Sequence, residues 1–190
     1  MDSIERQPHL ITPTLHLRPL RPEDWDALYA AASDPAIWAL HPAHDRWREP
    51  VFRAFFQQAL DSGGALAALD PAHGGIIGSS RFDLRRAGPG EMEIGWTFLA
   101  RRYWGGAMNA GMKRAMIGHA LRFVDRVIFL VGEDNLRSRR AMEKIGAVLT
   151  ERIAEPTGSP GRHVVYAIDR ANFLAGPLMA GAAAPGVAPE

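Results

Sequence analysis

The sequence predicts an α+β domain built on one mixed, twisted sheet of about seven strands flanked by about four helices. Three observations support this class: one strand pattern followed by two helical patterns, then three consecutive strand-like segments, then strands alternating with helices. The predicted order is βααβββαβαββ. A length of 190 residues suits a single domain with one sizeable core.

The N-terminal third is expected to supply one strand and two helices. Residues 15–20 alternate apolar and polar side chains, and Pro22 followed by two acids suits the first turn of a helix. That helix should stop near Pro35, because the residue before a proline disfavours helical geometry. A loop rich in Pro, His and Trp then runs to about Trp47, and residues 49–60 repeat apolar side chains at helical spacing.

The middle of the chain is expected to form an antiparallel meander. Residues 65–69, 75–84 and 91–99 are strand-like, and they are separated by Asp-Pro and by a Gly-Pro-Gly turn.

The second half returns to alternating elements. We expect a helix at about 107–123, a strand at 126–131 and a helix at 136–145, with a glycine suited to end the second helix. Closing strands are expected at 147–153 and 163–168. Residues 10–173 then form the domain, after a flexible N-terminus (1–9) and before a mobile tail rich in Ala, Gly and Pro (174–190).

Charge and cysteine content exclude several classes of function. Twenty-two basic and 21 acidic residues leave a net charge of +1, which does not indicate binding to nucleic acid or to a membrane. The chain has no cysteine, so a disulfide framework, a thiolate metal site and a cysteine nucleophile are excluded. Lacking an apolar leader or spanning segment, the protein is expected to be cytoplasmic.

The segment at 91–109 carries most of the chemical information. A strand runs into Gly105-Gly106, and the glycines open a helix. The first turn of a helix leaves N–H groups unpaired at the positive end of its dipole, so this junction can hold a diphosphate. By itself the pair is also compatible with an ordinary loop, and it fits neither a Walker loop nor a GxGxxG fingerprint.

Arg102-Tyr103-Trp104-Gly105-Gly106-Ala107 fits the pattern Gln/Arg-x-x-Gly-x-Gly/Ala. With this loop the chain resembles the GNAT superfamily of acyl-CoA-dependent acetyltransferases. Glu93-Ile94-Gly95 before the loop, and Asn135-Leu136-Arg137-Ser138 with Glu143-Lys144-Ile145-Gly146 after it, are similar to the ribosomal-protein alanine N-acetyltransferase branch. The element order also matches the GNAT fold.

The resemblance implies a site for acetyl-CoA. Amides of Trp104 to Met108 would bind the pyrophosphate, Arg102 would add charge, and the pantetheine arm would lie where the strand ending at Leu99 splays from residues 126–131. One arginine of the basic cluster Arg137, Arg139 and Arg140 could reach the 3′-phosphate, although a solvated face is the simpler interpretation. The candidate cofactor-binding residues are Thr97, Phe98, Leu99, Arg102, Tyr103, Trp104, Gly105, Gly106, Ala107, Met108, Asn135 and Ser138.

The expected reaction is direct attack of a neutral primary amine on the thioester, which needs no protein nucleophile. Glu93 is the candidate base acting through water, although an exposed strand carboxylate is an equal alternative. Strict alternation along this strand would divide its side chains between the two faces of the sheet. Glu93, Gly95 and Thr97 would lie on one face, and Met92, Ile94, Trp96 and Phe98 on the other.

A proton donor for the departing thiolate is the second requirement. No tyrosine lies in 135–145, so Ser138 is the candidate acid, although Asn135 and Ser138 also suit a helix cap and a first turn.

The loop before residue 48 is expected to border the acceptor pocket. Trp38, His41 and Trp47 are candidate contacts with the acceptor, and Trp96 and Phe98 favour a small acyl group. His41, His44 and Asp45 are interpreted as solvated polar residues, so no metal is expected.

Three functions remain open at this point. The first is an acetyl-CoA-dependent amine N-acetyltransferase acting on a peptide N-terminus or a small amine. The second is a catalytically silent acyl-CoA-binding or regulatory module, and the third is an unrelated α+β protein with an incidental glycine loop. The acceptor and the oligomeric state, including a homodimer, stay open.

Overall fold

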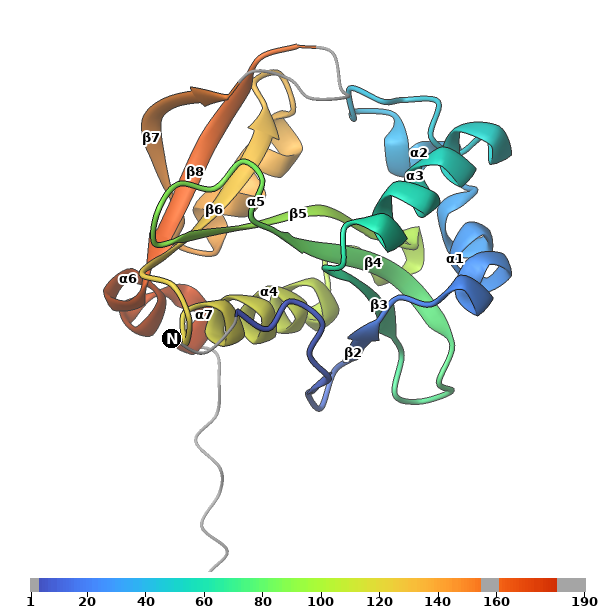
Figure 1. Ribbon diagram of the computed structural model, residues 1–190, viewed down its shortest axis with the longest axis horizontal. Coiled ribbons are helices and arrows are strands. Elements are labelled where there is room, and N and C mark those ends of the chain that lie inside the picture. Colours follow the sequence, from blue (N-terminus) through green and yellow to red (C-terminus); the bar gives the residue numbers. More distant parts are fainter. Residues whose placement is uncertain (1–3, 155–160, 181–190) are drawn as a thin grey trace, which may run out of the picture.

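The computed structural model describes residues 4–154 and 161–180, and these form a mixed sheet covered by helices on both faces (Figure 1). Its eight strands lie in the order β1-β2-β3-β4-β5-β6-β8-β7. All neighbours are antiparallel except β5 and β6. The predicted α+β class with a mixed sheet is confirmed. No helix within the described ranges has the length and apolar character needed to cross a bilayer.

The N-terminal elements contain one strand and one helix that the sequence patterns did not predict. The short strand β1 precedes β2, and a one-turn helix, α2, lies in the expected loop. Asp34 caps α2, because its side chain accepts a hydrogen bond from the Ala36 N–H at 3.0 Å, and Pro35 occupies the first turn. The bounds are β1 Leu10–Ile11, β2 His16–Pro19, η1 Pro22–Asp24, α1 Trp25–Ala32, α2 Pro35–Trp38 and α3 Glu49–Asp61.

The predicted meander is confirmed as three antiparallel strands, β3 Ala65–Leu69, β4 Ile76–Asp83 and β5 Glu91–Leu99. The second half follows as α4 Ala107–Ala120, β6 Arg126–Gly132, α5 Leu136–Lys144, β7 Val148–Ala154 and β8 His163–Asp169. β8 is later in the chain than β7 but lies between β6 and β7.

The two larger apolar cores lie on opposite faces of the sheet. One packs α4 and α5 against the sheet, with Met112 and Met116 fully buried. The other lies under α1, α2 and α3 and is mainly aromatic, with Phe52, Phe55 and Phe98. Figure 1 shows α4 on one side of β3, β4 and β5 and the α1–α3 group on the other. A ligand between β5 and β6 can therefore be reached from both faces.

Both ends of the domain differ from the expectation of flexible termini. Ile4 packs against the larger core, and the backbone carbonyl of Glu5 lies 2.8 Å from His119 Nε2. Residues 174–180, predicted to begin a mobile tail, belong to α6 (Arg170–Ala175) and α7 (Pro177–Ala180), and Leu178 is buried. Their small residues had suggested a solvated tail, but Leu178 supplies enough apolar surface to dock. Residues 181–190 lie outside the described ranges.

The predicted alternation of side chains along β5 is wrong after Gly95. The register with β4 shifts between Ser79 and Arg81, and Trp96 has a φ of 52°, so the strand contains a β-bulge. The bulge moves Thr97 to the α4 face and places Trp96 and Phe98 in the aromatic core. Glu93 and Gly95 therefore share a face with Trp96 and Phe98, not with Thr97.

Candidate active site

The cleft begins where β5 and β6 part. Their parallel pairing covers only Glu91–Glu93 against Arg126–Ile128, so the later residues of the two strands diverge. This is the predicted splay. The backbone edges that face the gap are available to a ligand, because neither strand pairs with the other there.

A cavity of about 860 Å³ occupies this gap and extends over the start of α4 and along α5. The volume is in the range of sites for extended small molecules. It is lined by segments from across the chain: Ile37, Trp38, Leu40, His41, Thr97, Phe98, Leu99, Trp104, Gly105, Gly106, Asn109, Ala110, Lys113, Asn135, Leu136, Arg137, Ser138, Arg140, Ala141, Met142, Lys144, Ile145, Pro177 and Leu178.

The glycine turn at the start of α4 leaves its amides open. Gly105 has a φ of +70°, which glycine adopts without strain, and no atom lies within 4 Å of where a Cβ would be at Gly105 or Gly106. Gly106 is the N-cap, and no side chain caps the helix. Within the described ranges, the N–H groups of residues 105–108 have no hydrogen-bond acceptor. They are therefore free to bind an anion at the positive end of the helix.

Two polar groups beside the turn are already in use. The Trp104 N–H donates to the Arg101 carbonyl at 3.1 Å, so the predicted contact of this amide with a pyrophosphate would require that bond to break. Trp104 Nε1 donates to the Leu99 carbonyl at 2.9 Å and ties the loop to the end of β5.

The cleft is cationic. Four basic side chains line it, and no Asp or Glu of the described residues does. The four are Lys113, Arg137, Arg140 and Lys144. A wall with this charge fits a polyanionic ligand.

Lys113 is the most buried of these cations. Its residue is 4% exposed, and its ammonium lies 3.2 Å from Thr97 Oγ1 on β5 and 4.9 Å from the centre of the Phe129 ring on β6. It therefore bridges the two strands where they part. Burial lowers the pKa of Lys113 to about 8, because the cation loses water and no carboxylate in the described ranges pairs with it.

The start of α5 forms the opposite lip of the cleft. Asn135 Oδ1 caps the helix by accepting the Ser138 N–H at 3.1 Å, which is the cap interpretation of these two residues, and both also line the cavity. Arg137 reaches across, with its guanidinium 4.5 Å from the Trp104 ring centre and a 3.3 Å bond to the Ile37 carbonyl. Arg139 faces away, toward Tyr166 and the Glu133 carbonyl.

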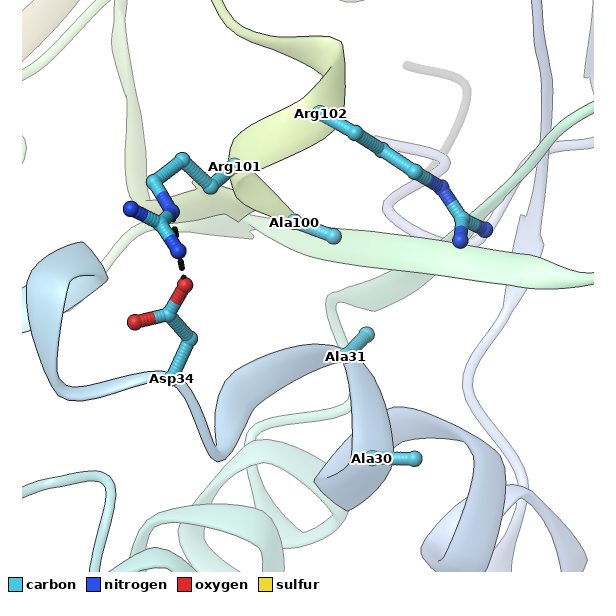
Figure 2. A pocket seen from close by; sticks show the side chains of 6 residues that line it. All are labelled: Ala30, Ala31, Asp34, Ala100, Arg101 and Arg102. Carbon is cyan, nitrogen blue, oxygen red and sulfur yellow. Dashed lines mark ion pairs between the residues drawn. The ribbon is translucent and has the colours of Figure 1, made fainter.

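Four predicted cofactor residues do not line this cavity: Arg102, Tyr103, Ala107 and Met108. The Tyr103 hydroxyl donates to Asp70 Oδ2 at 2.9 Å, so its ring braces the β3–β4 turn. Arg102 lines a separate shallow hollow beside the paired Arg101 and Asp34, and its side chain extends away from that ion pair (Figure 2). The Arg102 charge thus does not reach the glycine turn in this conformation.

Glu93 is not an exposed strand carboxylate. It is 1% exposed and pairs with Arg86 through two bonds of 2.5 and 3.0 Å. Burial raises the pKa of Glu93, while the Arg86 charge acts in the opposite direction. It does not line the cavity, so contact with a ligand there needs a bridging water.

The loop before α3 closes one end of the cleft. Trp38 and His41 line it, whereas Trp47 does not and instead accepts a 3.3 Å bond from Tyr29 on its carbonyl. Burial, followed by the charges of Arg46, His163 and Arg137, lowers the pKa of His41 to about 3, so its imidazole is neutral at pH 7. Its Nδ1 accepts the Ala43 N–H at 2.9 Å, which leaves Nε2 as the donor. The described residues contain no cluster of three or more metal-ligating side chains.

Sequence reasoning missed several groups of the cleft. It did not single out Lys113, although this residue follows the glycine turn by two helical turns and so faces the same side as the turn. Lys144 was also missed, although it follows Arg137 and Arg140 of the predicted basic cluster at helical spacing. Pro177 and Leu178 gave no signal, because they reach the cleft only through tertiary docking.

Comparison with known proteins agrees with this geometry. A family model described as an acetyltransferase (GNAT) domain matches residues 14–148. A GCN5-related N-acetyltransferase from Brucella melitensis has a TM-score of 0.73 at 18% identity, covering 90% of this chain and 82% of that one. A GNAT-family acetyltransferase from Bacillus anthracis has a TM-score of 0.68 at 22% identity, with coverages of 85% and 98%.

A third structure is a Vibrio cholerae protein provisionally named a ribosomal-protein-serine acetyltransferase. Its TM-score is 0.64 at 13% identity, with coverages of 86% and 98%. Among curated proteins, no sequence matches significantly. The family match covers most of the chain, and together with the splayed strands and glycine turn it shows that the chain belongs to the GNAT acetyltransferase family.

Proposed function

We propose that this protein is an acetyl-CoA-dependent N-acetyltransferase that transfers the acetyl group directly to a primary amine. The observation that carries the proposal is the cleft between β5 and β6, which combines open amides at a helix N-terminus with four basic side chains and no carboxylate among its described lining residues. Coenzyme A carries phosphates at one end and an uncharged arm at the other. The cleft has the same division, since its inner end is lined by Phe98, Leu99 and Trp38.

Each part of the cofactor then has a partner. The amides of residues 105–108 hold the pyrophosphate, with Arg137, Arg140 and Lys144 supplying further positive charge. Thr97, Phe98 and Leu99 line the channel for the pantetheine arm, and Asn135 and Ser138 face it from α5. Arg102 and Tyr103 act through the shape of the loop.

The reaction forms one C–N bond and breaks one C–S bond. The neutral amine attacks the thioester carbonyl, the carbonyl oxygen becomes an oxyanion, and its collapse expels the coenzyme A thiolate. One proton leaves the amine nitrogen and one proton is added to the sulfur. Glu93 is the proposed base, acting through water, because burial raises its affinity for a proton.

Two groups can protonate the thiolate. Ser138 lines the cleft on α5, and the ammonium of Lys113 lies in the splay itself, beside Thr97. Lys113 is the better acid, because a pKa of about 8 is close to that of a thiol and far below that of a serine hydroxyl. After transfer the neutral amine of Lys113 regains its proton from water.

The similarity to the ribosomal-protein branch supports a peptide N-terminus as one acceptor class, and a small-molecule amine is the other. A catalytically silent acyl-CoA-binding module is the alternative. The test is calorimetric titration with acetyl-CoA, followed by thiol release in the presence of N-terminal peptides and small amines. Binding with turnover supports the enzyme, binding without turnover on any amine supports the silent module, and absence of binding overturns both.

A further inference from the structure

The face of β4 and β5 under α1–α3 contains positive charge that the proposed mechanism does not use. Arg81 on β4 is 2% exposed, and its Nε and Nη2 atoms are out of contact with solvent and have no hydrogen-bond partner among the described residues. A buried guanidinium with two unbonded donors is costly, because those N–H groups have lost water and gained no hydrogen bond in return. Such a group is a candidate binding point for a hydrogen-bond acceptor.

The carboxylates nearest in strand register form no hydrogen bond with Nε or Nη2 of Arg81. Asp83 and Glu93 are register partners on the same face of the strand pair, but each binds a different arginine. Arg85 holds Asp83 with bonds of 2.5 to 3.1 Å, and Arg86 holds Glu93 at 2.5 Å.

A second buried arginine lies close by. Arg46 is 8% exposed, and its guanidinium lies 4.4 Å from the Phe55 ring centre and 5.2 Å from that of Trp38. Arg81 lies 5.8 Å from the same Phe55 ring. Within the described ranges Arg46 forms no ion pair, so its charge, like that of Arg81, favours an anion nearby.

The position of this pair relates it to the cleft. Trp38 and Phe98 line the cavity and contact each other, with ring centres 5.2 Å apart, and both pack on Phe55. Arg46 and Arg81 therefore lie directly behind the inner wall of the cleft, on the face opposite α4. That is the face from which an acceptor can meet a cofactor whose phosphates lie at the start of α4.

The arrangement of the two unbonded N–H donors of Arg81 favours one class of acceptor group. Nε and Nη2 lie on one edge of the planar guanidinium, and two parallel donors on one edge match the two oxygens of a carboxylate. The guanidinium carbon of Arg81 lies 4.5 Å from the centre of the Trp96 ring, so this ring borders the guanidinium. Trp96 is partly exposed and has a strained backbone, and we expect its ring to move when the edge is occupied.

We propose that the acceptor amine carries a carboxylate, which binds the free edge of Arg81 with Arg46 as the second cation. This inference rests on the proposed function, because it names the class of amine that the same site acetylates. It makes the protein selective for amino-acid-like acceptors over uncharged amines of equal size.

The test uses matched pairs of acceptors. Amino acids of two to six carbons, with the amine at the α or the terminal position, are each compared with their carboxamides in the thiol-release assay. We expect at least one carboxylate to exceed its carboxamide at least tenfold in kcat/KM, which corresponds to about 1.4 kcal/mol or more, the lower end for a charged hydrogen-bonded pair. Arg81→Lys keeps the charge but removes the paired donors, and it should abolish this preference while KM for acetyl-CoA stays unchanged.

Arg85→Lys is the matched control, since Arg85 is on the same hairpin and binds only Asp83 among the described side chains. It should keep the preference. Should Arg81→Lys fail to fold, Arg46→Lys provides the second variant, with a smaller loss expected.

The outcomes separate this inference from the proposed function. Turnover of carboxylates and carboxamides at equal rates overturns the inference alone. A higher kcat/KM for phosphate-bearing amines than for amino acids also overturns it, because the anion that binds Arg81 is then a phosphate. If no amine turns over, the same pairs are titrated calorimetrically against the coenzyme A complex. Binding of a carboxylate that Arg81→Lys abolishes then supports the inference without catalysis, and absence of such binding overturns it.

Discussion

The two faces of the sheet that meet at the splay of β5 and β6 differ in how their charged side chains are arranged. On the α4 side, Lys113 and the cations of α5 line an open cleft with no carboxylate among its described residues, and backbone amides point into it. On the α1–α3 side, three arginines lie against aromatic rings beside two buried carboxylates, and one guanidinium edge is left unpaired among the described residues. The open face suits a large ligand bound by many weak contacts, whereas the packed face suits a small ligand bound by a few strong ones.

The largest effect is expected from removing the charge of Lys113, which lies in the splay. Lys113→Met should lower kcat by about 10²-fold or more, in the range of general acid catalysis, if Lys113 protonates the thiolate. In the wild-type protein, kcat/KM for acetyl-CoA should fall as pH rises through about 8, because the acid must be protonated. This descending limb should be absent in Lys113→Met.

Lys113→Arg and Ser138→Ala complete that experiment. The arginine keeps the charge but cannot release a proton near pH 8, so it should bind acetyl-CoA well and turn over slowly. A pH limb that survives in Lys113→Met and disappears in Ser138→Ala would assign the role to the serine.

The next largest effect concerns the glycine turn. Gly105 and Gly74 both have positive φ, of +70° and +68°, and at neither position would an added Cβ have an atom within 4 Å. Alanine at either position should cost about 1–2 kcal/mol of stability, because both adopt the same left-handed backbone. Only Gly105→Ala should weaken acetyl-CoA binding, by about tenfold or more, since the methyl group would meet the phosphates.

Calorimetry and thermal melts of the two variants check this directly. Equal affinity for acetyl-CoA in Gly105→Ala and Gly74→Ala would remove the glycine turn from the cofactor site.

A smaller effect is expected from the neighbouring arginines of α5. Arg140 lines the cleft, while Arg139 bonds Tyr166 and Glu133 on the other side of the helix. Arg140→Gln should weaken acetyl-CoA binding about two- to fivefold, and less in high salt, as for an exposed ion pair. Arg139→Gln should leave the affinity unchanged.

The smallest effect should come from His41, at the border between the two faces. Its folded pKa of about 3 lies below the ordinary value of 6.5, so between these pH values the unfolded chain binds a proton that the folded chain refuses. Stability should therefore fall as pH falls through this window. His41→Asn should raise Tm relative to wild type by about 4–8 °C more at pH 5 than at pH 8, measured by differential scanning calorimetry.

The contrast between the faces also explains what the sequence could predict. The glycine turn, Asn135 and the strand leading to Leu99 are local features, so short motifs in the sequence were enough to predict that these residues line the cleft. The meander and the alternating second half were predicted because apolar residues recur at different spacings in strands and in helices. The phase of β5 after Gly95 was not predictable by alternation, because a single bulged residue shifts every later side chain.

The arginine face could not be predicted for a different reason. Arg46, Arg81 and Arg86 come from three separate segments, and nothing in their spacing says which of them pairs with a carboxylate. Whether Glu93 and Ser138 act as base and acid stays a prediction, since burial and position are compatible with that chemistry and do not test it.

The place of β8 has a consequence for synthesis of the chain on the ribosome. β8 ends at Asp169 yet lies between β6 and β7, so β7 has no strand to pair with until residues 163–169 have emerged. The wall made by α5 and by Pro177 and Leu178 is completed later still. A nascent chain therefore gains its glycine turn before its cleft, which is complete only after Leu178 has emerged, and chains that end at about residue 170 to 175 should have a formed meander and an unfinished cleft.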